Sequence, residues 1–170
     1  MTKATRRGLL ILYTGNGKGK TTAALGLALR AWGRGMRVVV FQFIKPSRLR
    51  SGEHLAAERL GMPIIPMGKG RGRSGPEDAQ QALEWCYEAI YSGRYDMVVL
   101  DELTYPLTYG WLPTEAVIKA LQGRPAPVHV VVTGRNAPPG LVEAADLVTE
   151  MLEVKHPLNK GIQAQPGIEF

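Results

Sequence analysis

Residues 9–22 read LLILYTGNGKGKTT, and this stretch predicts how the rest of the chain is arranged. Residues 9–13 are apolar and predict a short buried strand, whereas the Ala- and Leu-rich residues 21–32 predict a helix. Between them, residues 15–20 contain three glycines and two lysines. A strand, a Gly-rich loop that ends in Gly-Lys-Thr, and a helix are the signature of a phosphate-binding loop.

Each residue type in this loop has a physical task. Gly15, Gly17 and Gly19 lack a Cβ atom, so the backbone can adopt positive φ values that turn successive N–H groups toward phosphate oxygens. The following helix directs its N-terminal dipole to the same point. We expect Lys20 to reach the β and γ phosphates of a nucleotide and the hydroxyl of Thr21 to bind Mg²⁺.

One position departs from the usual G-x-x-x-x-G-K-[ST] pattern, because Thr14 replaces the first glycine. An ordinary Gly-rich turn between a strand and a helix is the alternative interpretation. A turn alone does not require Gly-Lys-Thr at the start of the helix. The stretch therefore favours phosphate binding.

The length and composition of the chain predict one domain. The chain has 170 residues, of which 45% are hydrophobic and 21% charged, and we expect a single domain over residues 1–170. No apolar run approaches the roughly 20 residues of a membrane span. The apolar stretch after Lys3, Arg6 and Arg7 is too short for a signal peptide. We therefore predict a cytoplasmic protein with no membrane partner.

Cysteine and histidine are scarce. Cys86 is the single cysteine, and the three histidines, His54, His129 and His156, are scattered along the sequence. Neither a disulfide framework nor a Cys/His zinc site can be assembled from these residues. Cys86 lies on the apolar face of a predicted helix, where we expect a core thiol.

The formal net charge of +6 predicts an anionic partner, and nucleotide phosphates, nucleic acids and acidic small molecules all fit. Basic residues are densest in one cluster, which we call the basic cluster: Lys45, Arg48, Arg50, Arg59, Lys69, Arg71 and Arg73. A solvated charged face explains such a cluster in ordinary terms, and a binding site for an anion is the alternative.

Apolar runs alternate with helical patterns along the rest of the chain. We predict further strands over residues 38–44, 63–67, 97–100, 128–133 and 147–154. Helices are predicted over residues 53–60, 113–121 and 141–145 and from Pro76 to a stop at Gly93, with an irregular tail over residues 155–170. This alternation predicts an α/β fold with a mostly parallel sheet of about six strands and helices on both faces.

The sequence VVLDE at residues 98–102 predicts the second half of a nucleotide site. Asp101 and Glu102 follow a buried strand, where a carboxylate can hold Mg²⁺ from the side opposite Thr21. Asp101 is the usual ligand in this kind of site, whereas Glu102 lies nearer the open end of the strand. In the alternative interpretation, Asp101 caps the next segment.

Binding of Mg·nucleoside triphosphate does not identify the reaction, because the same loop serves hydrolases, kinases and other transferases. Glu102 would be a candidate general base, and Arg135 a candidate for stabilising charge as an arginine finger does. The spacing of the sequence forces neither role.

Five stretches of the chain resemble one known family in the same order: TGNGKGKTTAALGLALRA, VVVFQFIK, VVLDELTYPLTYGWLP, VVVTGRNAP and VKHPLNKGIQAQPGIEF. They are similar to the P-loop corrinoid adenosyltransferases of the cobalamin pathway, which transfer the adenosyl group of ATP to Co(I). The most specific parts are TGNGKGKTT, with Thr14 in place of glycine, and DELTY at residues 101–105. Neither is typical of kinases or GTPases.

The resemblance implies that the Co(I) of a corrinoid attacks the 5′ carbon of ATP and expels triphosphate, in cobalamin biosynthesis or salvage. No general base is then required. The protein has to align the cobalt with the leaving oxygen and to stabilise charge that grows on the triphosphate. The resemblance also implies a RecA-like, three-layer P-loop fold, a homodimer, and a flavoprotein reductase as the electron source.

The site residues expected on these grounds form three overlapping sets. Those expected to bind ATP are Thr14, Gly15, Asn16, Gly17, Lys18, Gly19, Lys20, Thr21, Thr22 and Arg135. Those expected to act in catalysis are Lys20, Thr21 and Glu102. Those expected to hold Mg²⁺ are Thr21, Asp101 and Glu102.

One loop departs from the family pattern. Family members often carry Gly-Phe-Thr-Trp where residues 70–73 of this chain read Gly-Arg-Gly-Arg. We predict a mobile basic loop over residues 67–75, in which Arg71 and Arg73 favour early corrinoids that carry free carboxylates. In the alternative interpretation, the corrin is held by Tyr105, Tyr109 or Trp111.

Two other functions fit parts of the sequence. A small nucleoside kinase would need an acceptor-binding lid, and thymidine kinases of this size usually carry a zinc-binding lasso that a single cysteine cannot form. The basic cluster suggests a nucleic-acid-stimulated ATPase, but its loop has no interleaved aromatic residues on which bases could stack. We therefore expect no nucleic-acid partner. The product formed from ATP discriminates these functions, because the transferase releases triphosphate and the others ADP.

Overall fold

The computed structural model describes residues 7–46, 50–70 and 73–169 of the chain. Six strands form one sheet in the spatial order β3-β2-β4-β5-β1-β6, and all neighbouring strands are parallel. The strands are β1 (Leu10–Thr14), β2 (Val38–Pro46), β3 (Ile64–Gly68), β4 (Met97–Asp101), β5 (His129–Thr133) and β6 (Leu147–Glu150). The predicted parallel sheet is confirmed.

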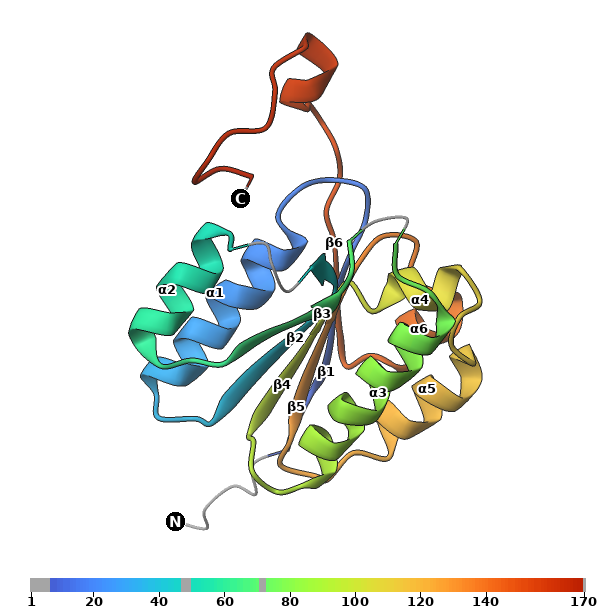
Figure 1. The fold of residues 1–170 in the computed structure, drawn as a ribbon. Helices are drawn as coiled ribbons and strands as arrows, with labels where there is room; N and C mark the ends of the chain where they lie inside the picture. The colour runs from blue at the N-terminus through green and yellow to red at the C-terminus, as the bar shows by residue number, and fades with distance from the viewer. Residues whose placement is uncertain (1–6, 47–49, 71–72, 170) are drawn as a thin grey trace.

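Helices cover both faces of the sheet and make three layers (Figure 1). One face is covered by α1 (Lys20–Gly33) and α2 (Gly52–Leu60). The other is covered by α3 (Pro76–Tyr91), α4 (Thr104–Thr108), α5 (Thr114–Gln122) and α6 (Pro139–Ala144). Within the described residues, no helix is long and apolar enough to span a membrane. The predicted three-layer α/β architecture is confirmed.

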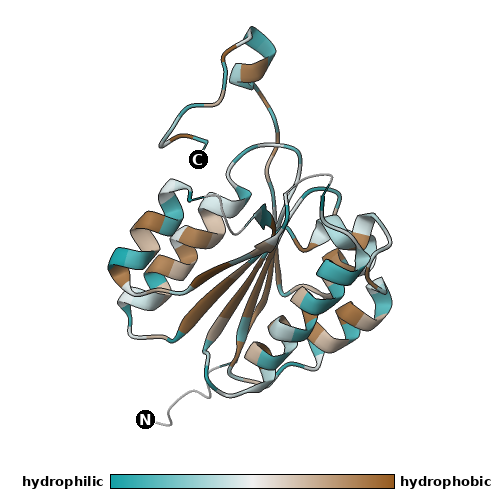
Figure 2. Cartoon of the chain, in the orientation of Figure 1, coloured by the Kyte–Doolittle hydropathy of each residue, from teal (hydrophilic) through white to brown (hydrophobic). Residues whose placement is uncertain are grey.

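Two hydrophobic cores lie on the two faces of the sheet, because successive strand residues point to opposite sides. Leu12 packs toward the core under α3 and α5, whereas Ile11 packs toward the core under α1. On that side α1 presents Ala24 and Ala28, both fully buried, and these small side chains let the helix lie close to the sheet. Figure 2 shows the strands as the most hydrophobic part of the ribbon. Cys86 is buried in the first core, and burial raises the pKa of its thiol, so the predicted core cysteine is confirmed.

The last strand is shorter than predicted. The apolar pattern predicts a strand over residues 147–154, but β6 ends at Glu150. Its neighbour β1 ends at Thr14, where the Gly-rich loop begins, so the chain after Glu150 has no strand to pair with. The predicted irregular tail contains one short 3-10 helix, η1 (Pro157–Lys160), in the segment that rises away from β6 in Figure 1.

One further difference lies directly after β4. Helix α4 follows Glu102 directly and was not predicted, since its sequence TYPLT has weak helix propensity. In the predicted basic loop, Lys69 forms an ion pair with Asp78 of α3 at 2.7 Å. Arg73 is exposed, whereas Arg71 lies outside the described residues.

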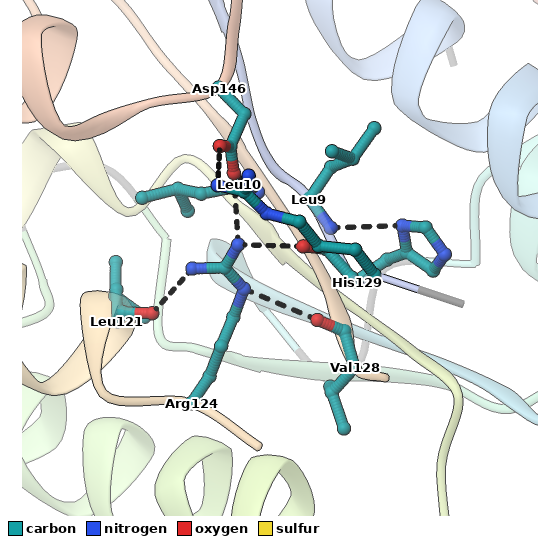
Figure 3. A network of polar contacts seen from close by, with 9 residues as sticks. Leu9, Leu10, Leu121, Arg124, Val128, His129 and Asp146 are labelled. Carbon is teal, nitrogen blue, oxygen red and sulfur yellow. Dashed lines mark hydrogen bonds and ion pairs between the residues drawn. The ribbon is translucent and has the colours of Figure 1, made fainter. Parts of the chain in front are cut away.

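A polar network fastens the start of β6 to the start of β1, at the end of the strands that lies opposite the Gly-rich loop (Figure 3). Asp146, just before β6, accepts hydrogen bonds through Oδ2 from Leu10 N at 2.8 Å and from Arg124 Nη2 at 3.0 Å. Its Oδ1 accepts from Arg7 Nη2 at 2.9 Å. Arg124 in turn donates to the backbone oxygens of Gly8, Leu121 and Val128. The network therefore holds the start of the edge strand β6 against β1.

We expect Asp146→Asn to lower the free energy of unfolding at neutral pH by about 1 kcal/mol, since water screens partly exposed ion pairs. The backbone N–H of Leu10, together with Arg7 and Arg124, holds the pKa of Asp146 below its ordinary value. A carboxylate with a lowered folded-state pKa stabilises the fold above the unfolded-state pKa of about 4 and loses this effect as the pH falls through the folded-state pKa. Urea unfolding at about pH 7 and about pH 3 measures the difference.

A matched control is Glu143→Gln, which neutralises an exposed carboxylate on α6. We expect it to change the free energy of unfolding by no more than about 0.5 kcal/mol at either pH. If Asp146→Asn is as stable as the parent at neutral pH, the network does not stabilise the sheet edge.

Candidate functional site

Glycines shape the loop between β1 and α1, and the C-terminal segment supports it. Gly15 (φ 96°) and Gly19 (φ 111°) adopt the left-handed backbone that favours glycine, as predicted. The prediction is wrong for Gly17, which is not among the residues with positive φ. Glycine is required there by space, because a Cβ would lie 2.6 Å from the backbone oxygen of Leu152. Gly17 N donates to Met151 O at 2.7 Å.

Lys20 begins α1 and turns its side chain back over the loop. It is 7% exposed, and its Nζ donates to Gly17 O at 2.7 Å. Burial lowers the pKa of Lys20, and the positive charge of Arg135 acts in the same direction. Asp101 and Glu102 oppose this shift without cancelling it. The ammonium group therefore sits where an additional negative charge would stabilise it.

Asp101 ends β4 and connects three other elements through its carboxylate. Oδ1 accepts hydrogen bonds from Thr21 Oγ1 at 2.8 Å and from Thr133 Oγ1 at 2.7 Å. Oδ2 accepts from Gln42 Nε2 at 3.2 Å. Asp101 is 1% exposed, so these bonds are shielded from water. The N-cap of α4 is Leu103, so the side chain of Asp101 binds the first turn of α1 and two strands and does not cap the following helix.

Glu102 has a strained backbone at the edge of the site. Its φ is 63°, in the left-handed region that residues other than glycine rarely adopt. Its N–H donates to Thr133 Oγ1 at 2.9 Å, which holds the turn. Strain of this kind is commonest at functional sites. As a result, Asp101 is buried while the next residue, Glu102, lines the cavity beside the loop.

The backbone at Arg135 is held by the side chain of Thr104, which packs against Gly134. The preceding Gly134 has φ 143°, and a Cβ there would lie 1.9 Å from Thr104 Oγ1. The same hydroxyl donates to Arg135 O at 2.7 Å. Glycine is thus required at this position for the loop after β5 to reach the site.

A cavity of about 620 Å³ lies beside the Gly-rich loop. Its polar wall includes Lys18, Lys20, Thr21, Glu102 and Arg135. Its apolar wall comes from α1, α2 and the start of β3, with Leu25, Leu29, Ala56, Leu60, Met62 and Ile64. Glu169, near the C-terminus, also lines it and forms an ion pair with Lys18. A cavity with one cationic and one apolar wall suits a phosphate ester with a flat organic part.

Most residues predicted to bind the nucleotide meet at this cavity. It is lined by Gly17, Lys18, Gly19, Lys20, Thr21, Thr22 and Arg135. Among the described residues that line it, Thr14, Gly15 and Asn16 do not appear. Thr14 is instead buried at the end of β1, where its backbone oxygen accepts from Met151 N at 2.9 Å. Thr14 thus joins the loop to the C-terminal segment.

The sequence did not identify four residues as part of the site near Asp101 and Glu102: Gln42, Lys45, His54 and Thr133. Gln42 is fully buried in β2 and bonds to both Asp101 and His54. The signal for it was available, because a single glutamine interrupts the apolar run VVVFQFI, and a buried amide requires hydrogen-bond partners. His54 carried no comparable signal, since its partner lies on another element.

Three aromatic side chains gather around α4. The ring centroids of Tyr105 and Tyr109 are 4.4 Å apart, and those of Tyr109 and Trp111 are 5.3 Å apart and stacked. Tyr109 Oη donates to Tyr105 Oη at 3.0 Å, and Tyr109 is 56% exposed. We call this group the aromatic cluster. It offers a partly exposed apolar surface next to the strand end that carries Glu102.

A site made of three or more His, Cys, Asp or Glu side chains is absent from the described part of the chain. The potential metal ligands that the structure brings near the loop are the side-chain oxygen atoms of Thr21, Asp101 and Glu102. Oxygen donors of this kind are the ones that Mg²⁺ prefers, and it usually takes its remaining ligands from phosphates and water.

Comparison with known proteins connects this geometry to a family. A sequence model of the family described as ATP:corrinoid adenosyltransferase BtuR/CobO/CobP matches residues 6–170. A corrinoid adenosyltransferase of Pseudomonas aeruginosa is 41% identical over 172 residues, which cover 96% of this chain and 84% of that protein. The corrinoid adenosyltransferase CobA of Salmonella typhimurium is 42% identical over 171 residues, which cover 96% of this chain and 86% of that protein.

A corrinoid adenosyltransferase of Escherichia coli (strain K12) is 40% identical over 170 residues, again 96% of this chain and 86% of that protein. These matches extend well beyond the Gly-rich loop, so they reflect the whole sequence and not one nucleotide motif. They cover the five stretches that resemble this family in the sequence. The chain belongs to the ATP:corrinoid adenosyltransferase family.

Proposed function

We propose that this protein transfers the 5′-deoxyadenosyl group of ATP to the Co(I) of a corrinoid and releases triphosphate. Family membership supports this reaction and gives no support to a nucleoside kinase or an ATPase. The structural observation that carries the proposal is the cavity in which Lys18, Lys20 and Arg135 lie beside the Thr21–Asp101 pair. It collects positive charge and hydroxyl groups where a triphosphate would leave.

The reaction forms one bond and breaks one. Co(I) supplies the electron pair of the new Co–C5′ bond, while the C5′–O5′ bond breaks and its electron pair leaves with the triphosphate oxygen. No proton moves in this step, so the protein needs no general base. Its tasks are to align the two substrates and to stabilise the leaving triphosphate through Lys20, Arg135 and the loop N–H groups.

Mg²⁺ fits the residues next to the loop. The Thr21 hydroxyl donates a hydrogen bond to Asp101 Oδ1, which leaves the lone pairs of Thr21 Oγ1 for a cation. Glu102 lines the cavity, so it is better placed than the buried Asp101 for direct contact with a metal ion. Thr21 and Glu102 would hold Mg²⁺, and Asp101 would orient Thr21. Bound Mg²⁺ would neutralise part of the triphosphate charge.

The corrinoid has two candidate contact surfaces, the basic loop and the aromatic cluster. The aromatic cluster, with exposed Tyr109, offers an apolar surface for a large ring system. Selection of carboxylate-rich corrinoids by Arg71 and Arg73 stays a prediction, since Arg71 lies outside the described residues. A homodimer, a flavoprotein reductase as electron donor and a cytoplasmic location are likewise proposals from the family resemblance.

Ion pairs at three residues of the basic cluster favour a small anionic substrate over nucleic acid. Lys45 forms an ion pair with Glu53, Arg50 with Glu58, and Lys69 with Asp78. These cations are therefore engaged within the protein and are not presented as a continuous surface for a phosphate backbone.

We expect Lys20→Ala to lower turnover at least about 100-fold, because it removes a preorganised charge beside the leaving triphosphate. Turnover is measured by loss of the Co(I) absorption with ATP, Mg²⁺ and a chemically reduced corrinoid. Lys119→Ala is the matched control, since it removes an exposed lysine from α5 and should leave turnover unchanged. A folded Lys20→Ala variant with the parent rate would refute the role of Lys20. Formation of ADP in place of triphosphate by the parent would refute the reaction.

We expect Glu102→Gln to raise the half-saturating Mg²⁺ concentration roughly tenfold with little change in melting temperature. Asp101→Asn should raise it too and should also lower the melting temperature, because an asparagine cannot accept bonds from Thr21, Thr133 and Gln42 at once. Mg²⁺ titrations of turnover and thermal unfolding measure both effects. Parent-like Mg²⁺ dependence in both variants would show that neither carboxylate serves the metal ion.

A further inference from the structure

A chain of hydrogen bonds runs from Asp101 to the first turn of α2. Gln42 Nε2 donates to Asp101 Oδ2 at 3.2 Å, and Gln42 Oε1 lies 2.7 Å from His54 Nε2. On the other side of the ring, His54 Nδ1 lies 3.1 Å from Ser51 N and 2.9 Å from Ser51 Oγ. Gln42, Ser51 and Asp101 are at most 2% exposed, so water does not compete for these bonds.

The backbone N–H of Ser51 fixes the direction of every bond in this chain. An N–H group can only donate, so His54 Nδ1 accepts and carries no proton. The neutral ring then carries its proton on Nε2 and donates it to Gln42 Oε1. Because Gln42 Oε1 accepts, the amide nitrogen of Gln42 is the atom that faces Asp101.

The surroundings of His54 support the same neutral form. Lys45 Nζ can only donate and lies 3.3 Å from Ser51 Oγ, so the hydroxyl proton of Ser51 is left to face His54 Nδ1. Burial lowers the pKa of His54, and the positive charges of Lys45 and Arg50 act in the same direction. At neutral pH the ring therefore stays a donor toward Gln42 and an acceptor toward Ser51.

We propose that His54 is a positioning residue: it fixes the orientation of the Gln42 amide, and Gln42 holds the Asp101 carboxylate in the rotation that orients Thr21. Asp101 binds Gln42 through Oδ2 and Thr21 through Oδ1, so a rotation of the carboxylate would move both contacts together. Without the donor at His54 Nε2, Gln42 Oε1 loses this partner, and only the bond to Asp101 Oδ2 then restrains the rotation of the Gln42 amide.

The inference rests on the proposed function, because it concerns the Mg·ATP end of the same cavity. Its consequence is a link between two walls of that cavity. His54 lies in the first turn of α2, next to Gly52 and Glu53, which line the cavity. The hydrogen bonds through Gln42 therefore connect the wall made by α2 with the oxygen atoms proposed to hold the metal ion.

Two variants separate this role from a role in the helix cap alone. His54→Asn keeps an acceptor near Ser51 N, in the place of Nδ1, but its side chain is too short to donate to Gln42. His54→Gln is long enough to present an acceptor to Ser51 N and an amide donor to Gln42. A cap role predicts that both variants keep the parent behaviour, whereas a positioning role predicts that only His54→Gln does.

Calorimetry of the full chain gives the readout, as the affinity for ATP measured with and without Mg²⁺. We expect His54→Asn to reduce the affinity for ATP with Mg²⁺ roughly tenfold, as is usual when a residue that orients a metal ligand is lost. Its affinity for ATP without Mg²⁺ should match that of the parent. His54→Gln should match the parent under both conditions, and the half-saturating Mg²⁺ concentration for turnover should follow the same order.

A double-mutant cycle tests the path through Gln42. Gln42→Met removes the amide at similar volume, and we expect it to weaken binding of Mg·ATP by itself. If His54 acts through Gln42, then adding His54→Asn to Gln42→Met causes no further loss.

Three outcomes would overturn the inference. These are parent-like Mg·ATP binding by His54→Asn, an undiminished effect of His54→Asn in the Gln42→Met background, and a lower melting temperature of His54→Asn with unchanged Mg²⁺ dependence. Failure of the proposed function looks different, because the parent would then form no triphosphate. Calorimetry with ATP and Mg²⁺ would still report on His54 in that case.

Discussion

The buried carboxylate of Asp101 is the contact on which the rest of the site depends. It accepts hydrogen bonds from Thr21 of α1, Gln42 of β2 and Thr133 of β5 while being 1% exposed. An ionised carboxylate in that position is tolerated only when such donors surround it. The three donors can reach it only if β2 and β5 flank β4 and if α1 starts beside the end of β4. The hydrogen bonds to Asp101 can therefore form only with this strand order.

A second constraint ties the Gly-rich loop to the chain after β6. Met151 N donates to Thr14 O at 2.9 Å, and Met151 O accepts from Gly17 N at 2.7 Å. A Cβ at Gly15 would lie 2.4 Å from Met151 O, so glycine is needed for the contact as well as for its φ. The chain that continues from β6 later brings Glu169 to Lys18. The loop is therefore shaped by residues far away in the sequence.

Local patterns predicted the features that local forces determine. The strand, loop and helix over residues 9–22 follow from apolar runs and glycines, and the apolar run before Asp101 places a carboxylate at a strand end. The roles of Gln42 and His54 could not be predicted in this way, because each depends on a partner from another element. Helix α4 was missed because tertiary burial of Thr104, Pro106 and Leu107, and not helix propensity, stabilises it. The end of β6 was missed because the length of its neighbour decides it.

In the proposed reaction, the electrostatics of the cavity would favour the leaving triphosphate over bound ATP. Burial and the charge of Arg135 lower the pKa of Lys20, and Asp101 and Glu102 only partly offset them. The ammonium group of Lys20 is thus held by Gly17 O before any phosphate arrives, and the neighbouring carboxylates do not fully compensate its charge. When the C5′–O5′ bond breaks, the triphosphate gains one negative charge within this fixed field. Interactions that strengthen as the bond breaks accelerate the reaction, whereas uniform binding does not. Because Co(I) is a very strong nucleophile, the protein would accelerate the proposed reaction by aligning the triphosphate and by stabilising it as it leaves.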